Sequence, residues 1–375
     1  MKKNFVPNIL LLAFISGCSA MGSFKDKFKP TAVRREEKNF KVIWSRHLDP
    51  EYDVGNLPIG LSSPFMYSSL LFIGDLKGRM TAHNLEDGRE IWQQTEKDEL
   101  GSIAGIYRDH LIYGSYNGRA IARHYLTGEL KYSVDLGAPV ESKPIIYRDR
   151  LFYHVRNHQV ASLDAATGKI LWTYRRSVPF TTTLQRVSDV FPLDNKLIVG
   201  FADGDLVALS VEDGNVLWER KLATGVKFID VDASPVLFNG KLYAGSVAGA
   251  LSVINPESGA LERTYDYSIS RSPVIIDGQL LVGTINGMIY VIDSTGSQIR
   301  EKKLSAQGIS SIVEWKGGLV VSTLGGKLYF LNKKNLDVIE TYSLGSAYSS
   351  VMGELAVLGD YLSVFSSRNH LYIFR

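Results

Sequence analysis

The side chains that could carry catalysis or hold a metal ion are few and scattered in this chain. Cys18 is the only cysteine, which excludes a disulfide within the chain and leaves no second thiolate for a zinc site. The seven histidines are spread over most of the sequence: His47, His83, His110, His124, His154, His158 and His370. We therefore predict no catalytic residue and no metal site from local spacing. A site assembled from several parts of the fold stays open.

Two glycine-rich phrases could be mistaken for the turn that carries a serine nucleophile. They are Gly-Ser-Tyr-Asn-Gly at 114–118 and Gly-Ser-Val-Ala-Gly at 245–249. Neither has the Gly-x-Ser-x-Gly spacing, nor the strand-to-helix context, that such a turn requires. Glycines at these positions instead supply the positive φ of a hairpin turn.

Two aspartate phrases invite comparison with a calcium loop: Asp164–Gly168 and Asp293–Gly296. They lack the alternating carboxylates of such a loop. An aspartate before a glycine more commonly caps a turn with its own side chain, which is the role we expect for Asp164 and Asp293.

All of these phrases belong to a unit that recurs about every forty residues, a period typical of propellers and other repeat folds. One complete copy runs from Ser234 to Gly259. Each copy holds short β-branched and aromatic runs separated by Gly, Asn-Gly or Asp-Gly, which is the signature of consecutive hairpins. Four strands fill a unit and leave no room for a crossover helix. His158 stands where other copies have a turn glycine.

The final copy ends before its fourth strand, the one that carries Trp92, Trp172 and Trp218 in other copies. We expect these tryptophans to pack between neighbouring blades. Phe40–Trp44, near the start of the chain, resembles that missing strand. Its pairing with Leu371–Phe374 would close the ring and remove the open edges. The sequence thus predicts an all-β protein: an eight-bladed β-propeller of four-stranded antiparallel blades, closed by an N-terminal strand.

The first residues have the pattern of an export signal. Lys2 and Lys3 are followed by an apolar stretch, too short to span a bilayer, and by Ile15-Ser16-Gly17-Cys18, which resembles the bacterial lipobox. We predict a signal peptide at 1–17, a lipidated Cys18 that begins a flexible tether over 18–39, and a propeller over 40–375. Ser19 after the cysteine favours the outer membrane, facing the periplasm.

The net positive charge of the chain lies outside the predicted propeller. Of a net +3, Lys2 and Lys3 contribute two charges and residues 19–39 contribute three, which leaves −2 for the propeller. Nucleic-acid binding needs a strongly basic surface, so we expect no nucleic-acid partner.

Ser162–Trp172 resembles the repeat of quinoprotein-type propellers, which quinone-dependent dehydrogenases and the BamB family of outer-membrane assembly lipoproteins share. The dehydrogenases are much longer and often carry an adjacent-cysteine disulfide and a calcium site; with Cys18 alone, this chain cannot form that disulfide. The chain resembles the BamB family over nearly its full length: lipobox, tether, eight units and split closure. The resemblance implies no cofactor.

The resemblance also implies a partner-binding site. Asp230-Val231-Asp232-Ala233-Ser234-Pro235-Val236 looks like a family segment whose two aspartates support binding to BamA. A second family contact has a Leu-x-Leu-Arg core. Here it corresponds to Leu184, Gln185 and Arg186, with Thr182 in place of the first leucine and the arginine one position late. Spacing alone favours ordinary solvated loop residues for the two carboxylates, and the resemblance favours the partner-binding role instead.

The resulting hypothesis is a non-catalytic, lipid-anchored scaffold that binds the POTRA region of BamA and assists the insertion and folding of outer-membrane β-barrel proteins. Nascent outer-membrane proteins, adding to exposed strand edges, are a further class of partner. The alternatives are a quinoprotein-like dehydrogenase and a ligand-binding periplasmic propeller.

Overall fold

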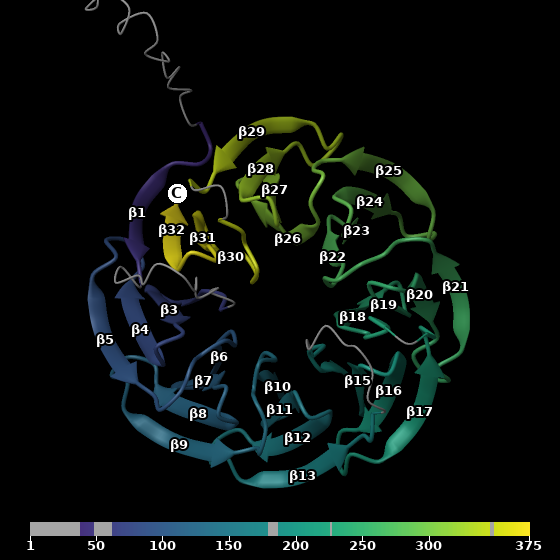
Figure 1. Cartoon of the computed structure of the whole chain (residues 1–375), viewed down its shortest axis with the longest axis horizontal. Coiled ribbons are helices and arrows are strands. Elements are labelled where there is room, and N and C mark those ends of the chain that lie inside the picture. Colours follow the sequence, from purple (N-terminus) through teal and green to yellow (C-terminus); the bar gives the residue numbers. More distant parts are fainter. Residues whose placement is uncertain (1–37, 49–61, 179–186, 226, 346–348) are drawn as a thin grey trace, which may run out of the picture. The chain divides into compact units, whose positions relative to one another are not determined.

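The computed structural model describes residues 38–48, 62–178, 187–225, 227–345 and 349–375. Lys38–Arg375 form one compact unit, in which eight four-stranded antiparallel sheets surround a central axis (Figure 1). The described residues contain no helix. The prediction of an eight-bladed propeller with four-stranded blades is confirmed.

The blades follow one another in chain order, except that the eighth takes its last strand from the beginning of the described chain. Blades 1 and 2 are β2 (Phe65–Tyr67), β3 (Leu70–Gly74), β4 (Arg79–Asn84), β5 (Glu90–Thr95), and β6 (Gly105–Tyr107), β7 (His110–Gly114), β8 (Arg119–His124), β9 (Leu130–Asp135). Blades 3 and 4 are β10 (Ile145–Tyr147), β11 (Arg150–Val155), β12 (Gln159–Asp164), β13 (Ile170–Arg175), and β14 (Phe191–Leu193), β15 (Lys196–Gly200), β16 (Asp205–Ser210), β17 (Val216–Lys221).

Blades 5 and 6 are β18 (Ala233–Phe238), β19 (Lys241–Gly245), β20 (Leu251–Ile254), β21 (Leu261–Tyr265), and β22 (Val274–Ile276), β23 (Gln279–Gly283), β24 (Met288–Ile292), β25 (Gln298–Lys303). Blades 7 and 8 are β26 (Ile309–Trp315), β27 (Gly318–Thr323), β28 (Lys327–Leu331), β29 (Val338–Ser343), and β30 (Ala356–Leu358), β31 (Tyr361–Phe365), β32 (His370–Phe374), β1 (Val42–His47).

Burial follows the position of a strand within its blade. The second and third strands lie between neighbouring blades and are buried almost throughout, as in β3 and β16. The fourth strands form the outer wall (Figure 1) and alternate between exposed and partly buried residues, as in β13. A sheet that is covered on both faces tolerates continuous apolar runs, whereas an outer strand needs alternation. The core is therefore a ring of apolar layers between blades.

The ring closes where β1 pairs antiparallel with β32. Trp44 lies opposite Ile373, which confirms the predicted closure. The strand begins at Val42, two residues later than Phe40–Trp44 suggests. Phe40 instead inserts between blades 7 and 8, where it is fully buried, with its ring 5.5 Å from Phe374 and 6.0 Å from Trp315.

Each tryptophan that ends a repeat packs on the next blade, as expected. The indole Nε1–H of Trp172 donates to the carbonyl of Val211 at 3.0 Å, and its ring lies over Gly214. Gly214 has a φ of +74°, and a Cβ there would come within 2.6 Å of the indole, so both the turn and the contact require glycine. Trp44, Trp92 and Trp218 make equivalent contacts on Gly88, Gly128 and Gly259.

The expected turn roles of Asp164, Asp293 and His158 are also confirmed, whereas among the glycines of 114–118 and 245–249 only Gly118 has the expected positive φ, of +87°. Asp164 Oδ1 accepts hydrogen bonds from the backbone N–H of Thr167 at 2.8 Å and from its hydroxyl at 2.8 Å. Asp293 Oδ1 caps its own turn in the same way, through Thr295 and Ser297. His158 has a φ of +61°, as the turn position requires.

The antiparallel order gives the propeller two different ends. The connections between blades and the turns between second and third strands lie at one end, which we call the connection end. The turns between third and fourth strands, including those under the tryptophans, lie at the other, which we call the turn end.

Candidate functional site

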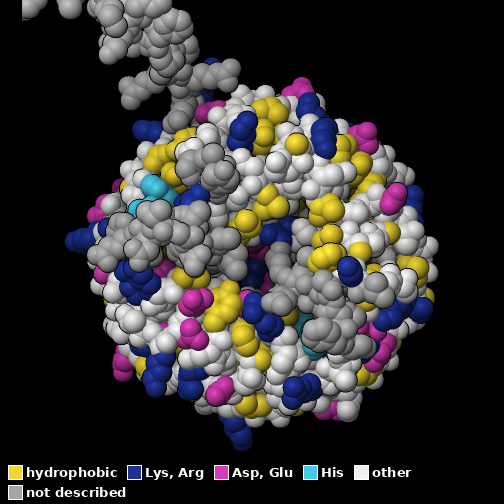
Figure 2. Space-filling model, viewed as in Figure 1, with side chains coloured by type: hydrophobic (Ala, Val, Ile, Leu, Met, Phe, Trp, Pro, Cys, Tyr) yellow, Lys and Arg dark blue, Asp and Glu magenta, His cyan; other side chains and the backbone are white. Residues whose placement is uncertain are grey.

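A cavity of about 390 Å³ opens on the propeller axis at the connection end. Its walls come from all eight blades, mainly from the residues just before each innermost strand. Figure 2 shows acidic and basic side chains in and around the central opening. The lining side chains that matter below are Glu141, Lys143, Asp189, Asp232, Arg271 and Glu354.

Side chains before the innermost strands join neighbouring blades. Ser63 Oγ accepts the N–H of Glu354 at 2.7 Å, which links blade 8 to blade 1. Asp189 Oδ1 accepts the N–H of Lys143 at 2.9 Å, and Ser234 Oγ accepts the N–H of Asp189 at 2.8 Å. The serine of the repeated Ser-Pro phrase is therefore a hydrogen-bond acceptor that holds adjacent blades in register.

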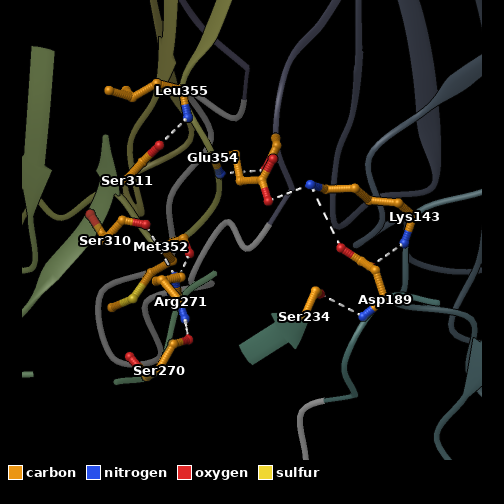
Figure 3. Close-up of polar contacts among 11 residues, drawn as sticks. Lys143, Asp189, Ser234, Ser270, Arg271, Ser310, Ser311, Met352, Glu354 and Leu355 are labelled. Carbon is orange, nitrogen blue, oxygen red and sulfur yellow. Dashed lines mark hydrogen bonds and ion pairs between the residues drawn. The ribbon is translucent and has the colours of Figure 1, made fainter. Parts of the chain in front are cut away.

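Lys143 bridges blades that are not neighbours. Its Nζ lies 2.5 Å from Glu354 Oε1 and 3.6 Å from Asp189 Oδ2, so the ammonium reaches from blade 3 to blade 8 at the channel mouth (Figure 3). Burial disfavours the charged ammonium, but the carboxylates of Glu354 and Asp189 outweigh it and raise the pKa of Lys143. Lys143 therefore stays protonated and restricts the channel.

Arg271 occupies the opposite part of the cavity wall and binds three backbone carbonyls. Nε donates to Ser310 at 3.1 Å, Nη1 to Ser270 at 3.0 Å and Nη2 to Met352 at 2.7 Å (Figure 3). These carbonyls come from the chain before blades 6 and 8 and from β26 of blade 7. The guanidinium thus ties three successive blades together while it faces the cavity.

The Asp230–Asp232 segment lies in the connection between β17 and β18. The backbone N–H of Val231 donates to the carbonyl of Phe201 at 3.1 Å. A Cβ on Gly200 would come within 2.2 Å of the Val231 carbonyl, so this close approach requires glycine. Asp230 and Asp232 are 1% and 4% exposed, and Asp232 lines the cavity. Their carboxylates are built into the connection rather than displayed on its surface.

Leu184, Gln185 and Arg186 lie outside the described residues. The connection that contains them joins β13 to β14, and two residues of its described continuation, Val187 and Asp189, line the cavity at the connection end. The Asp189 carboxylate accepts a hydrogen bond from the backbone N–H of Lys143 in blade 3. The backbone N–H of Asp189 donates to the hydroxyl of Ser234, the second residue of β18. The two predicted contact segments therefore belong to consecutive connections between blades.

Three residues of this end were missed by sequence reasoning. Phe228, in the same connection as Asp230, is 41% exposed and has a φ of +55°, an uncommon backbone conformation for a bulky residue. The other two, Lys143 and Arg271, interrupt the repeat around Ser-Pro. Arg271 stands where other copies have a buried serine: Ser62, Ser102, Ser142 and Ser188. Comparison of the copies position by position would have found both cations.

His154 and His158 have a His-x-x-x-His spacing, which was overlooked when no metal site was predicted from local spacing. On a strand and its turn, this spacing does not place both rings on one helical face. His154 is buried, its Nδ1 lies 3.0 Å from the carbonyl oxygen of Ser188, and burial lowers its pKa to about 4. In the described part of the chain, no group of three potential metal ligands comes together. Nor does that part contain a helix long and apolar enough to cross a membrane.

Several known proteins resemble this chain along most of its length. Outer membrane protein assembly factor BamB of Yersinia pestis is 22% identical over 395 aligned positions, covering 100% of this chain and 99% of that protein. The Escherichia coli K12 protein of the same name is 26% identical over 279 positions, 70% of each chain.

Solved structures show the same fold. The crystal structure of BamB from Moraxella catarrhalis superimposes with a TM-score of 0.76 at 20% identity, covering 90% of this chain and 99% of that one. A quinohemoprotein alcohol dehydrogenase from Pseudomonas putida HK5 also matches, with a TM-score of 0.66 at 12% identity, over 90% of this chain and 76% of that one. At these identities, both likenesses concern the fold alone.

The sequence model of one protein family matches residues 76–293, more than half of the chain, and that family is described as outer membrane protein assembly factor BamB. The match spans β4 to β24 and so covers most of the repeat. This chain belongs to the BamB family of outer membrane protein assembly factors.

Proposed function

We propose that this protein is a non-catalytic scaffold of the outer-membrane protein assembly machinery, which binds the POTRA region of a BamA-like barrel protein through its connection end. The observation that carries the proposal is the family membership, together with the place of Asp230 and Asp232 in a connection next to the one that holds Leu184–Arg186. Relatives of the family are named as assembly factors, which favours a scaffold over an enzyme.

Different residues have different roles in this proposal. Asp230 and Asp232 are buried, so they fix the shape of the connection rather than meet the partner first. Phe228 is exposed beside them and would be an apolar anchor. Leu184, Gln185 and Arg186 would add apolar contact and a fork-like donor for a carboxylate.

The propeller holds the described parts of these connections, at Asp189 and at Asp230–Asp232, on a rigid base. Gly200 and Phe201 of blade 4 support the Asp230–Asp232 segment, and Ser234 supports Asp189. A surface that is ordered before binding loses little conformational entropy when it binds. The partner surface would therefore need few new contacts to bind specifically.

The proposal includes attachment to the membrane. Residues 1–17 would be removed as a signal peptide, and lipidated Cys18 would anchor the propeller to the outer membrane through the tether of residues 18–39. Replacement of Cys18 by serine is expected to move the protein from the membrane fraction to the soluble periplasmic fraction. Retention of Cys18→Ser in the outer membrane without its partner would contradict lipidation at this residue.

Affinity purification of the tagged full-length chain tests the partner. The wild-type protein is expected to co-purify a BamA-like barrel protein. The double variant Asp230→Ala with Arg186→Ala should lose most of it, and Phe228→Ala alone should reduce it by about tenfold, as for an interface anchor. The matched control is Ile275→Ala, because Ile275 is also an exposed apolar residue. Phe238 is buried and therefore cannot serve as the control. Full co-purification by the double variant would reject this surface.

A further inference from the structure

The axial cavity has the size and the mixed walls of a small-molecule site. Ligand pockets commonly enclose about 300–1,000 Å³, and this cavity of about 390 Å³ lies within that range. Ile103, Val187, Ile309, Leu324 and Met352 give it apolar surface. Polar groups converge on it from several blades, which is typical of sites that fix the orientation of a ligand.

Arg271 is a cation without a carboxylate partner in the described structure. Three other basic side chains near this end are ion-paired: Arg156 with Glu141, Arg176 with Asp203, and Lys143 with Glu354. No described carboxylate lies within 4.0 Å of Arg271, whose three hydrogen bonds go to neutral carbonyls. A guanidinium has five N–H donors, so two remain for the cavity. A planar fork with a full positive charge suits a carboxylate.

The rest of the wall carries the opposite charge. Four carboxylates line the cavity, those of Glu141, Asp189, Asp232 and Glu354. Arg156 pairs with Glu141, Lys143 contacts both Asp189 and Glu354, and Arg271 is the third cation, so the carboxylates exceed the cations by one. This excess of negative charge disfavours a polyanion, because each additional anionic group would face a carboxylate. It favours a ligand with one carboxylate for Arg271 and one ammonium for the acidic wall near Asp189 and Glu354.

We propose that the axial cavity binds a short peptide with free termini, its C-terminal carboxylate on Arg271 and its N-terminal ammonium toward Asp189 and Glu354. Arg271 breaks the repeat at a position where a serine suffices for the fold in other blades. The arginine therefore adds a charge that those blades do without, besides its three hydrogen bonds to the carbonyls of Ser270, Ser310 and Met352. The apolar residues between the two charged regions contact the small side chains of the peptide.

This inference goes beyond the proposed partner. Asp189 and Asp232 belong both to the cavity wall and to the connections of the proposed partner surface, whereas Arg271 belongs to the cavity alone. Loss of one activity need not remove the other, so peptide binding and co-purification are measured on the same variants.

Calorimetry and thermal unfolding of the purified full-length chain test the proposal with trialanine as the probe. Trialanine is expected to bind saturably and to raise the unfolding temperature. Trialanine amide, which lacks the carboxylate, should bind at least about tenfold more weakly, the factor that corresponds to 1.4 kcal/mol. Citrate, a polyanion, should bind more weakly than trialanine.

Two variants assign the effect to the site. Arg271→Ser restores the residue of the other copies and should weaken trialanine binding at least about tenfold. Arg263→Ser, the matched loss of an exposed arginine on outer strand β21, should leave it unchanged. No saturable binding, equal binding of the amide, preference for citrate, or full binding by Arg271→Ser would each overturn the proposal. The comparison of acid with amide uses the wild-type chain and so does not depend on whether the variant folds.

Discussion

The two ends of the propeller differ in how closely they keep the repeat. At the turn end, Trp44, Trp92, Trp172 and Trp218 each pack on a glycine of the next blade and donate to a carbonyl there. At the connection end, the corresponding positions of different blades carry Lys143, Asp189, Ser234 or Ser272. The same fold thus keeps one indole–glycine contact at the turn end, whereas at the connection end side chains of different types accept the backbone N–H that links adjacent blades.

This difference separates residues that hold blades together from residues that are available for binding. A contact that recurs in several blades is required by the geometry that all blades share. A residue that departs from the repeat, such as Arg271 or Asp230, has a role that the shared geometry of the blades does not require. The predictions below test this division from the largest expected effect to the smallest.

The largest effect is expected where the ring closes. Phe40→Ala removes a fully buried ring that packs against four aromatic side chains, those of Trp315, Phe330, Tyr342 and Phe374. We expect a loss of about 4 kcal/mol in the free energy of unfolding. Denaturant unfolding followed by tryptophan fluorescence measures it. Phe40→Leu should recover more than half of the loss, and an unchanged midpoint for Phe40→Ala would exclude a role in closure.

The next effect is a dependence on pH. His154 is buried and its folded-state pKa is about 4, below the ordinary value of 6.5. The unfolded state therefore binds the proton first, and stability falls as the pH drops from about 6.5 toward 4, by up to about 3 kcal/mol for this group. His154→Gln should make the free energy of unfolding less dependent on pH in this range. Part of the dependence remains, because the pKa of His83 is also lowered to about 4. An equal slope in wild type and variant would contradict the assignment.

A smaller loss is expected at the turn end. Gly214→Ala combines a positive φ with a close approach to the Trp172 indole, and should cost about 2 kcal/mol in the free energy of unfolding. Gly240→Ala is a matched control, since Gly240 has a similar φ of +73° and nothing within 4 Å of the added Cβ. Thermal unfolding of both variants separates the strain of the turn from the clash with tryptophan. Equal losses of stability in the two variants would show that the contact of Gly214 with Trp172 does not stabilise the fold.

The smallest effect on stability is expected at the channel mouth. The Lys143 and Glu354 side chains are 32% and 46% exposed, so solvent screens their ion pair. Lys143→Met with Glu354→Gln should change the free energy of unfolding by less than about 1 kcal/mol. A loss of several kcal/mol in the free energy of unfolding would show that this ion pair is needed to hold the blades together.

The sequence is sufficient to predict most of the fold because the repeat signals are local. Glycines and aspartates mark the turns, apolar runs mark the strands, and the lone strand around Trp44 completes the last blade. The position of Phe40 could not be predicted in this way, since its burial depends on the space between blades 7 and 8 once the ring has closed.

The site is less predictable, because closure brings together residues that are distant in the chain. Lys143 meets Glu354 only when blades 3 and 8 face the same channel. The burial of Asp230 and Asp232 depends on the approach of Val231 to Gly200 of the preceding blade. Motif spacing gives the identity of these residues but not whether their side chains point outward.

Hydrogen–deuterium exchange of the full-length chain, with and without the periplasmic region of a BamA-like partner, tests the division between the two ends most directly. The account predicts slower exchange of backbone amides at 227–232 and 187–190 when the partner is present, and no change at the turns of 164–168 and 211–215. Protection confined to the turn end, with unchanged exchange at 227–232, would contradict it.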